Sequence, residues 1–322
     1  AGYTGTLVLD LAKVLDHNGA SVSAALTWTT PPSGGFPQAT AASASNTFQY
    51  QDVGTITFNM DAVVDSTFTL VDQVGGDCVS ASTSATLDLQ NKYGCNIGSA
   101  AFGPLGRFYP DHFSVDVGLS PHCAAGGFTY MDDDALGVTL LVKAQSKSNV
   151  TTSRYKTPSS TYVPVASLAV TLLNGSSSTD LLARLSQPVA PVRAWTAGEY
   201  AATDTYRFDA RNLATPVVDG PYDSLKFRVT ITDATDAVKI STLNGAALSP
   251  SVSTVDSDIT TVRFGRLWLA NAYGTEKNVL KMRYEAQHWN GSAFVTNGLD
   301  NCTSFVAANI ALGNLQGTLA AP

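Results

Sequence analysis

The sequence predicts an all-β protein made of two or three stacked antiparallel β-sandwiches of the immunoglobulin-like type. Apolar and polar residues alternate with a period of two in most apolar segments, which places one face in a core and the other in water. Helical periodicity is nearly absent, and its two short candidates are residues 11–17 and 302–308. Clusters of Gly, Pro, Asn and Ser interrupt the strands at short intervals, a pattern typical of sandwiches.

The clearest strand alternates Leu225, Phe227, Val229 and Ile231 with polar residues. The same alternation predicts strands at residues 6–11, 49–60 with an interruption at Gly54, 138–144, 167–172, 262–269 and 279–286. Turn chemistry separates the strands at residues 30–35, 75–77, 145–153, 174–178, 219–223 and 244–245. Most of the regular structure is therefore expected to be β.

The length predicts more than one domain. A chain of 322 residues exceeds a usual single domain, and 44% apolar residues suffice for a sizeable core. We place one boundary near residues 105–111, which gives an N-terminal β-sandwich at 1–107 and a C-terminal β-sandwich region at 108–322. The second region is either divided near residues 194–206 or continuous as one large sandwich.

The charge balance excludes several partners. Only 14% of the residues are charged and the formal net charge is −7. Binding nucleic-acid phosphates takes clustered Lys and Arg, and no basic stripe occurs, so no nucleic-acid partner is expected. No apolar run approaches about 20 residues and no charged-then-apolar leader is present, so we expect neither a membrane-spanning segment nor a signal peptide.

The four cysteines, Cys78, Cys95, Cys123 and Cys302, lie far apart and form no Cys-x-x-Cys pair. This spacing argues against a metal site and favours two disulfides. Three connectivities are possible, and we favour Cys78 with Cys95, which closes a short loop, and Cys123 with Cys302. Disulfides place the protein outside the cytoplasm, with a reduced cytosolic protein as the alternative.

The histidines give no catalytic pattern. Asp111 and His112 are adjacent, and neighbouring residues on a strand point to opposite faces, so they are not expected to act as an acid and base pair. We interpret Asp111 as a turn cap beside Pro110, with Phe108 and Phe113 anchoring a linker between two sandwiches. The other histidines lack metal-ligand spacing and are expected at the surface or at corners: His17, His122 and His288.

The densest acidic run is Asp132, Asp133 and Asp134. Oxygen-rich loops at the ends of sandwiches can hold calcium, but the EF-hand pattern is absent, and a solvated loop is the favoured interpretation. Asp233 and Asp236 resemble this run. Several arginines lie near aromatic residues and are expected to pair with carboxylates such as Asp209 and Asp223: Arg207, Arg211, Arg263 and Arg266.

No hydrolase, zinc-protease or nucleotide-binding signature occurs, so we predict no catalytic residue, no cofactor and no metal. A glycosidase needs no local signature and stays open; it requires an exposed Trp195, Trp268 or Trp289 beside two carboxylates in a groove. We expect Trp268 and Trp289 to face a core, although alternation with Leu267 and Leu269 also allows Trp268 to face outward.

Many short motifs occur in an order that resembles one protein family. They are the segments at residues 50–56, 106–113, 123–131, 219–223, 264–274, 289–291, 294–297 and 300–303, with sequences such as Gly-Arg-Phe-Tyr-Pro-Asp-His-Phe and Asn-Ala-Tyr-Gly. Together they resemble the C-terminal domain of MshQ-like proteins, which are encoded with mannose-sensitive haemagglutinin type IV pilus systems. That domain family has no established activity.

The resemblance implies a secreted or cell-surface bacterial β protein associated with pili. We therefore expect a non-enzymatic structural or adhesive module, with pilus components, other copies of itself or surface glycans as partners. One alternative is a subunit of a self-assembling filament that exchanges terminal strands such as residues 6–11. The other alternative is a secreted carbohydrate-active enzyme.

Overall fold

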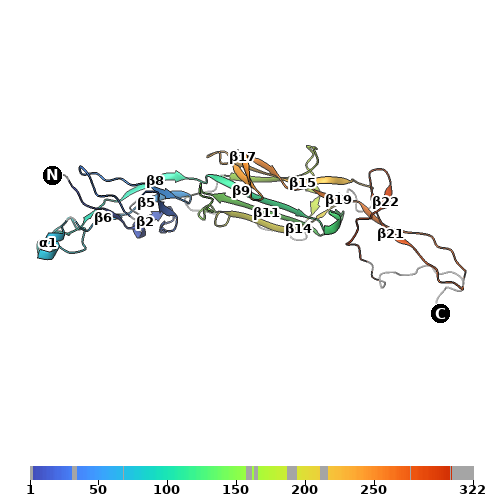
Figure 1. The fold of residues 1–322 in the computed structure, drawn as a ribbon, viewed down its shortest axis with the longest axis horizontal. Helices are drawn as coiled ribbons and strands as arrows, with labels where there is room; N and C mark the ends of the chain where they lie inside the picture. Colours follow the sequence, from blue (N-terminus) through green and yellow to red (C-terminus); the bar gives the residue numbers. More distant parts are fainter. Residues whose placement is uncertain are drawn as a thin grey trace.

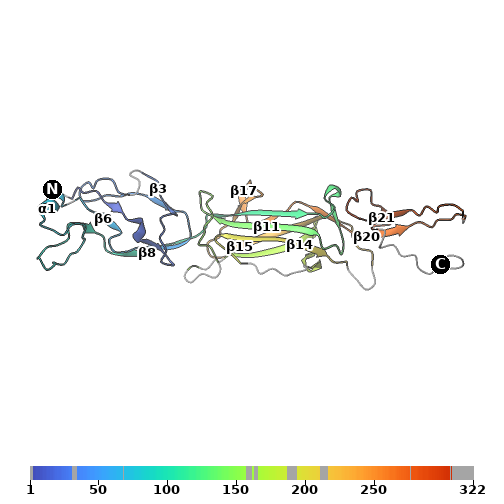
Figure 2. The ribbon, with the colours of Figure 1, turned by 90° about the horizontal axis from the view of Figure 1, so that it is seen from below.

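The computed structural model describes residues 3–30, 35–67, 69–156, 162, 166–186, 194–210, 217–275, 277–304 and 306. The molecule is elongated, and its strands lie in three groups in a row (Figures 1 and 2). We call them the N-terminal body (residues 3–108), the central body (109–263) and the C-terminal sheet (264–304). Arg211 and parts of the predicted turn at 30–35 and of the predicted helix at 302–308 lie outside the described residues.

The N-terminal body contains three small antiparallel sheets. Its apolar core contains Val14, Val22, Ile56 and Ala62, which are buried. The sheets are β1 (Val8–Leu9) with β6 (Val63–Asp65) and β7 (Ile97–Gly98); β2 (Val14–Asp16) with β5 (Gly54–Phe58) and β8 (Phe102–Phe108); and β3 (Leu26–Trp28) with β4 (Phe48–Tyr50). The helices are η1 (Leu11–Lys13) and α1 (Leu70–Gly75).

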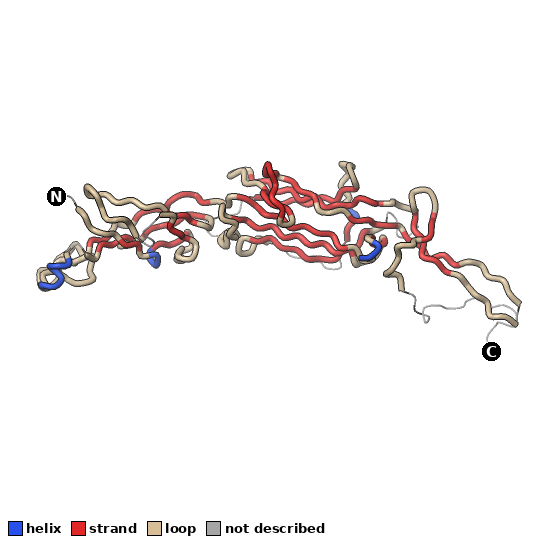
Figure 3. The backbone as a smooth tube through the Cα atoms, in the orientation of Figure 1, coloured by secondary structure: helices blue, strands red, loops and turns tan. Residues whose placement is uncertain are grey.

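The central body is a sandwich of two sheets whose strands run along the long axis (Figure 3). In one sheet the strand order is β13 (Leu185–Ser186), β14 (Glu199–Phe208), β11 (Leu136–Gln145), β9 (His112–Ser120), β16 (Ile240–Leu243) and β17 (Ala246–Val252). In the other sheet the order is β10 (Phe128–Tyr130), β19 (Thr260–Arg263), β15 (Tyr222–Asp233) and β12 (Ala166–Asn174), and β18 (Thr254–Asp256) also pairs with β15. Short 3-10 helices occur at η2 (Ala124–Gly126) and η3 (Leu182–Arg184).

The core of the central body lies between these sheets. Phe113 and Val115 from β9 pack in one cluster with Leu225 and Phe227 from β15. Every second residue of β15 from Leu225 to Ile231 is buried, so the predicted strand and its inward face are confirmed. The all-β fold predicted from the sequence is likewise confirmed. Two strand pairs differ from the predicted antiparallel pattern: β10 pairs with β19, and β9 with β16, in parallel orientation.

The C-terminal sheet contains β20 (Gly265–Leu269), β21 (Tyr284–Trp289) and β22 (Phe294–Thr296). A long loop joins β20 to β21 and extends away from the central body (Figure 1). Among the described residues no second layer covers this sheet, and Leu267, Trp268 and Leu269 are exposed. No described helix is long and apolar enough to cross a membrane.

Some predicted elements are wrong in detail. Only Leu11–Lys13 of the candidate helix at 11–17 is helical, because Val14 and Asp16 both point inward and form β2. Residues 302–304 of the second candidate are not helical. The predicted strand at 262–269 is split at Phe264, where the chain passes from β19 to β20, and the strand at 279–286 begins only at Tyr284. Helix α1 was not predicted from the sequence.

The predicted boundary near 105–111 covers the last residues of β8 and the three residues that lead to β9. The second position, 194–206, coincides largely with β14, which pairs with β11 over eight residues from Glu199 to Tyr206. The limits of the domains themselves stay a prediction.

Candidate functional site

Two junctions join the three groups of strands, and each holds a network of polar contacts. The N-terminal junction is built by Arg154, Asp16, Asp52, Arg107 and Asp236. The C-terminal junction is built by the cysteines Cys123 and Cys302 with Tyr130, Asn297 and Asp300. Each set brings together residues that lie far apart in the sequence.

Arg154 links the central body to the N-terminal body. Its Nη1 donates to Asp52 Oδ2 at 2.9 Å, its Nε donates to Asp16, and its backbone N–H donates to Asp52 Oδ1 at 2.9 Å. Both carboxylates are buried, each residue being 6% exposed. A single guanidinium therefore satisfies two buried anions from the neighbouring body.

The surroundings of Asp16 hold it in the charged form. Burial raises the pKa of Asp16, but the hydrogen bonds from Arg154 and from the backbone N–H groups of Ala20 and Asn18 outweigh burial. The pKa of Asp16 is therefore lowered. Burial opposes the charge of Arg154 as well, yet its carboxylate partners raise the pKa of its guanidinium.

A second contact at this junction joins Arg107, at the end of β8, to Asp236 of the central body. Their atoms Nη2 and Oδ2 are 2.6 Å apart, and the guanidinium lies 5.2 Å from the ring centre of Tyr162, which is buried. Burial raises the pKa of Asp236, and Arg107 partly offsets this. Val53, from the loop before β5, adds an apolar contact because it belongs to the core of the central body.

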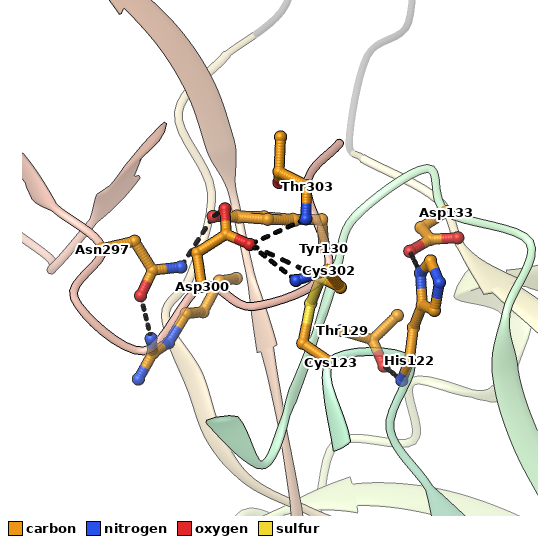
Figure 4. Close-up of a disulfide and its surroundings, with 10 residues drawn as sticks. His122, Cys123, Thr129, Tyr130, Asp133, Asn297, Asp300, Cys302 and Thr303 are labelled. Carbon is orange, nitrogen blue, oxygen red and sulfur yellow. Dashed lines mark hydrogen bonds and ion pairs between the residues drawn. A yellow bond between two sulfur atoms is a disulfide. The ribbon is translucent and has the colours of Figure 1, made fainter. Parts of the chain in front are cut away.

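The C-terminal junction contains a disulfide between Cys123 and Cys302, which are separated by 179 residues (Figure 4). Their Cα atoms are 5.0 Å apart, and Cys123 is fully buried. The side chain of Asp300 accepts hydrogen bonds from the backbone N–H groups of Cys302 and Thr303 at 3.1 and 2.9 Å. Asp300 therefore shapes the turn that presents Cys302 to its partner.

A chain of polar contacts surrounds the disulfide. Tyr130 donates its hydroxyl to Asp300 at 3.0 Å and accepts a hydrogen bond from Asn297 at 2.6 Å, and Asn297 accepts one from Arg263 at 2.6 Å. Burial is the main cause that raises the pKa of Tyr130 to about 12. Burial also raises the pKa of Asp300, but the hydrogen bonds from Thr303, Cys302 and Tyr130 outweigh it and lower the pKa overall.

Cys78 and Cys95 form the second disulfide, with Cα atoms 5.1 Å apart in the loop after α1. The structure thus pairs all four cysteines in the connectivity that the sequence favoured. Within the described part of the chain, Cys123, Asp300 and Cys302 form a group with metal-like spacing. Because both sulfurs are bonded to each other, this group offers no thiolate to a metal.

Asp111 and His112 differ from the prediction. Their side chains touch, with Asp111 Oδ2 2.9 Å from His112 Nδ1. The two side chains were expected on opposite faces of a strand. This is wrong because Asp111 lies in a bend before β9, where its backbone N–H donates to the carbonyl of Gln145. As expected for anchors, Phe108 packs on the N-terminal core and Phe113 is buried in the central core.

The remaining histidines occupy different surroundings. His122 is exposed and lies 2.5 Å from Asp133 (Figure 4). His17 and His288 are half-buried rather than at the surface, and burial lowers the pKa of each. The ring of His17 lies against Gly54, whose missing side chain leaves room for it.

The acidic run does not converge on one point. Asp132 accepts a hydrogen bond from the backbone of Ala210 at 2.9 Å, Asp133 contacts His122, and Asp134 lies 3.5 Å from Arg207. The two later acids also separate, since Asp233 accepts backbone hydrogen bonds within its own turn and Asp236 contacts Arg107.

Of the three predicted arginines that the structure describes, one has the expected carboxylate partner. Arg207 pairs with Asp209 at 2.7 Å. Arg263 and Arg266 instead donate to the amide oxygens of Asn297 and Gln287, and each stacks on a phenylalanine ring. The expectation of carboxylate partners for these two was wrong because their strands bring amide side chains opposite them.

The tryptophans do not gather in a groove. Trp195 is 7% exposed and packs on Tyr155 with ring centres 4.8 Å apart. Trp289 is half-buried against Phe294. Trp268 is 37% exposed, so it does not face a described core, and its partner across the strand pair is Glu285.

The N-terminal junction was not predicted from the sequence. Arg154 lies 138 residues from Asp16 and 102 from Asp52, and no local pattern marks any of the three. The C-terminal junction was predicted in part, since the spacing of the four cysteines favoured the disulfide between Cys123 and Cys302.

Comparison with known proteins identifies the two parts that the C-terminal junction joins. Residues 79–257 match DUF6701, third domain, and residues 263–321 match DUF6701, fourth domain. Cys123 lies in the first match and Cys302 in the second, so their disulfide crosslinks two successive family domains. No curated protein and no solved structure matches the chain. With more than half of its length matched, the chain belongs to the DUF6701 family.

Proposed function

We propose that this chain is a non-enzymatic structural and adhesive module of an extracellular, pilus-associated bacterial surface protein, similar in role to MshQ-like proteins. The observation that carries the proposal is the row of β bodies whose two junctions are both fixed by specific contacts (Figure 1). A stalk on a cell surface needs this property because it must hold its ends apart under load.

The two disulfides support an extracellular location, since disulfides persist in oxidising compartments. The resemblance to MshQ-like proteins, carried by the motifs at residues 106–113 and 264–274, supports the association with pili. One of these motifs forms the passage from the N-terminal to the central body, and the other begins the C-terminal sheet. The resemblance thus falls on the parts that set the shape of the molecule.

The filament alternative has a specific observation in its favour, which is the apolar surface at the two ends of the molecule and is taken up below. Residues 6–11 are not that surface. β1 pairs with β6 on one side, and on the other side Val8 bridges to Gly35 while Phe36 donates to Leu7. The enzyme alternative gains no support from Trp195, which is buried.

The test uses the native bacterium, with the gene deleted and then restored. Antibody labelling of intact cells reports surface exposure, electron microscopy reports piliation, and a binding assay reports attachment to surfaces. We expect labelled wild-type cells and a loss of piliation or attachment in the deletion strain. Unlabelled intact cells, or a deletion strain with unchanged piliation and attachment, would overturn the proposal.

A further inference from the structure

The far end of the N-terminal body carries an exposed apolar knob. α1 and the loop after it lie at this end in both side views (Figures 1 and 2). In that loop Leu89 is 97% exposed and Leu87 is exposed as well. Asp88, which lies between the two leucines, fixes the turn that runs on to Lys92. Its carboxylate accepts hydrogen bonds from the backbone N–H groups of Gln90 and Lys92 at 2.8 and 2.9 Å.

The knob is held in place from both sides. The disulfide between Cys78 and Cys95 closes this loop, and Val79 exchanges backbone hydrogen bonds with Tyr93 and Cys95 at 2.8 and 3.0 Å. A fixed turn that exposes leucine loses little conformational freedom on binding, which favours contact with a partner. Three exposed aspartates flank it: Asp72, Asp77 and Asp88.

The opposite end of the molecule carries an apolar groove with basic flanks. The loop between β20 and β21 surrounds a groove of about 430 Å³. Tyr273, which is 92% exposed, and Val279, which is 93% exposed, line it together with Leu280, and Met282 of the same loop is exposed too. The exposed basic side chains of this loop are Lys277, Lys281 and Arg283.

The charge of the chain is divided between these ends. Residues 70–97, at the knob end, hold three Asp and one Lys, a net charge of −2, and residues 270–283, in the loop at the other end, hold three Lys and Arg and one Glu, a net charge of +2. One end is thus acidic with a leucine knob, and the other is basic with an apolar groove. Surfaces of opposite charge attract and orient each other.

We propose that the occupant of the groove is a second copy of this chain, whose Leu87 and Leu89 enter the groove while its aspartates face Lys277 and Lys281. Such a contact is head to tail, and repeated along the long axis it yields a linear assembly. The inference deepens the structural role proposed above. It can fail while that role stands, since a stalk also works as a single copy.

An anionic membrane is the competing partner for a basic apolar loop. It would explain the basic apolar loop between β20 and β21 but not the acidic knob at the other end, which an anionic surface repels. A second copy uses both ends, and for this reason we favour it.

The experiment is sedimentation velocity of the purified, oxidised chain over a range of concentrations, at low and at high salt. We expect concentration-dependent association that weakens as salt rises. Leu89→Asp should weaken association at least about tenfold, because burial of a leucine is worth about one to two factors of ten in affinity. The matched control is Ile259→Asp, an exposed apolar residue of the central body, which should associate like the wild type.

A charge exchange makes the test specific. Lys277→Glu with Lys281→Glu on one sample, and Asp72→Lys with Asp77→Lys on another, should each reduce self-association, and mixing the two samples should restore association. A monomer at every concentration, association that Leu89→Asp leaves unchanged, or binding of anionic phosphatidylglycerol vesicles by a chain that does not self-associate would each overturn the inference. None of these results would alter the surface labelling or attachment that tests the proposed function.

Discussion

At the scale of single residues, Arg154 shows how an ion pair acts at a junction. Burying the carboxylates of Asp16 and Asp52 costs solvation energy, and the guanidinium of Arg154 offsets this cost. Its loss leaves two buried carboxylates without their cation. The contact therefore contributes more to fixing one body against the other than to net stability.

We predict that Arg154→Met lowers the free energy of unfolding by about 3 kcal/mol, because removal of one partner strands buried charge. Chemical denaturation measures this change. The control, Arg207→Met, removes a more exposed pair with Asp209 and should cost clearly less stability than Arg154→Met. Equal effects of the two variants would contradict the account of the N-terminal junction.

The predictability of the two junctions from sequence differs for a physical reason. Four cysteines leave only three connectivities, so Cys123 with Cys302 was one choice among few. Arg154 is one of 19 basic residues and its partners are two of 26 acidic ones. Only the folded topology brings these three residues together, and nothing local to any of them records it.

At the scale of elements, β15 and β18 illustrate how charge joins strands. Asp256 of β18 lies opposite Arg228 and accepts from it at 2.7 and 2.9 Å, and Lys226 lies 2.7 Å away. The hydrogen bond from Arg228 is the largest cause that lowers the pKa of Asp256 from 3.8 to about 2. The short strand β18 is thereby tied to the longest strand of its sheet.

We predict that Asp256→Asn lowers the free energy of unfolding by about 1 kcal/mol at neutral pH, after allowance for solvent screening. Because the folded pKa lies below the unfolded value, the contribution of Asp256 is complete above pH 3.8 and is lost as pH falls towards about 2. The stability difference between wild type and variant should therefore shrink over that interval. Denaturation at a series of pH values checks this, and a constant difference would refute it.

Elements were predictable where one face is buried against a sheet. β15 follows strict alternation because its inner residues, Leu225 to Ile231, fill the sandwich core. Alternation did not predict the break within residues 262–269, where the chain leaves one sheet and enters another. Gly265 packs against the ring of Tyr130 at this point, and a Cβ there would lie only 2.4 Å from that ring. Local pattern records burial, but it does not record the point where a strand changes partner.

At the scale of the whole molecule, the junctions differ in kind. The N-terminal junction depends on charge and apolar contact, whereas the C-terminal junction is covalent. Because the disulfide spans 179 residues, it restricts the unfolded chain far more than the disulfide that spans 17.

We predict that Cys123→Ser with Cys302→Ser lowers the free energy of unfolding by about 5 kcal/mol, and that Cys78→Ser with Cys95→Ser lowers it by about 3 kcal/mol, from loop entropy. The first variant should also expose the segment from 264 to 304 to proteases, because the main chain at Arg263 and Phe264 is then the covalent link that remains between that sheet and the central body among the described residues. Limited proteolysis with mass spectrometry measures this. Cleavage of the two variants at the same rate in that segment would argue against the assigned role.

The spacing of the cysteines also sets an order of oxidation when the chain is made. Cys95 follows Cys78 by 17 residues, so this pair can close soon after synthesis, whereas Cys123 waits for a partner 179 residues downstream. In the folded chain the pairing of β10 with β19 holds the two parts of the chain that carry these cysteines side by side. Because synthesis runs from the N-terminus, the second crosslink can close only after nearly the whole chain has been made.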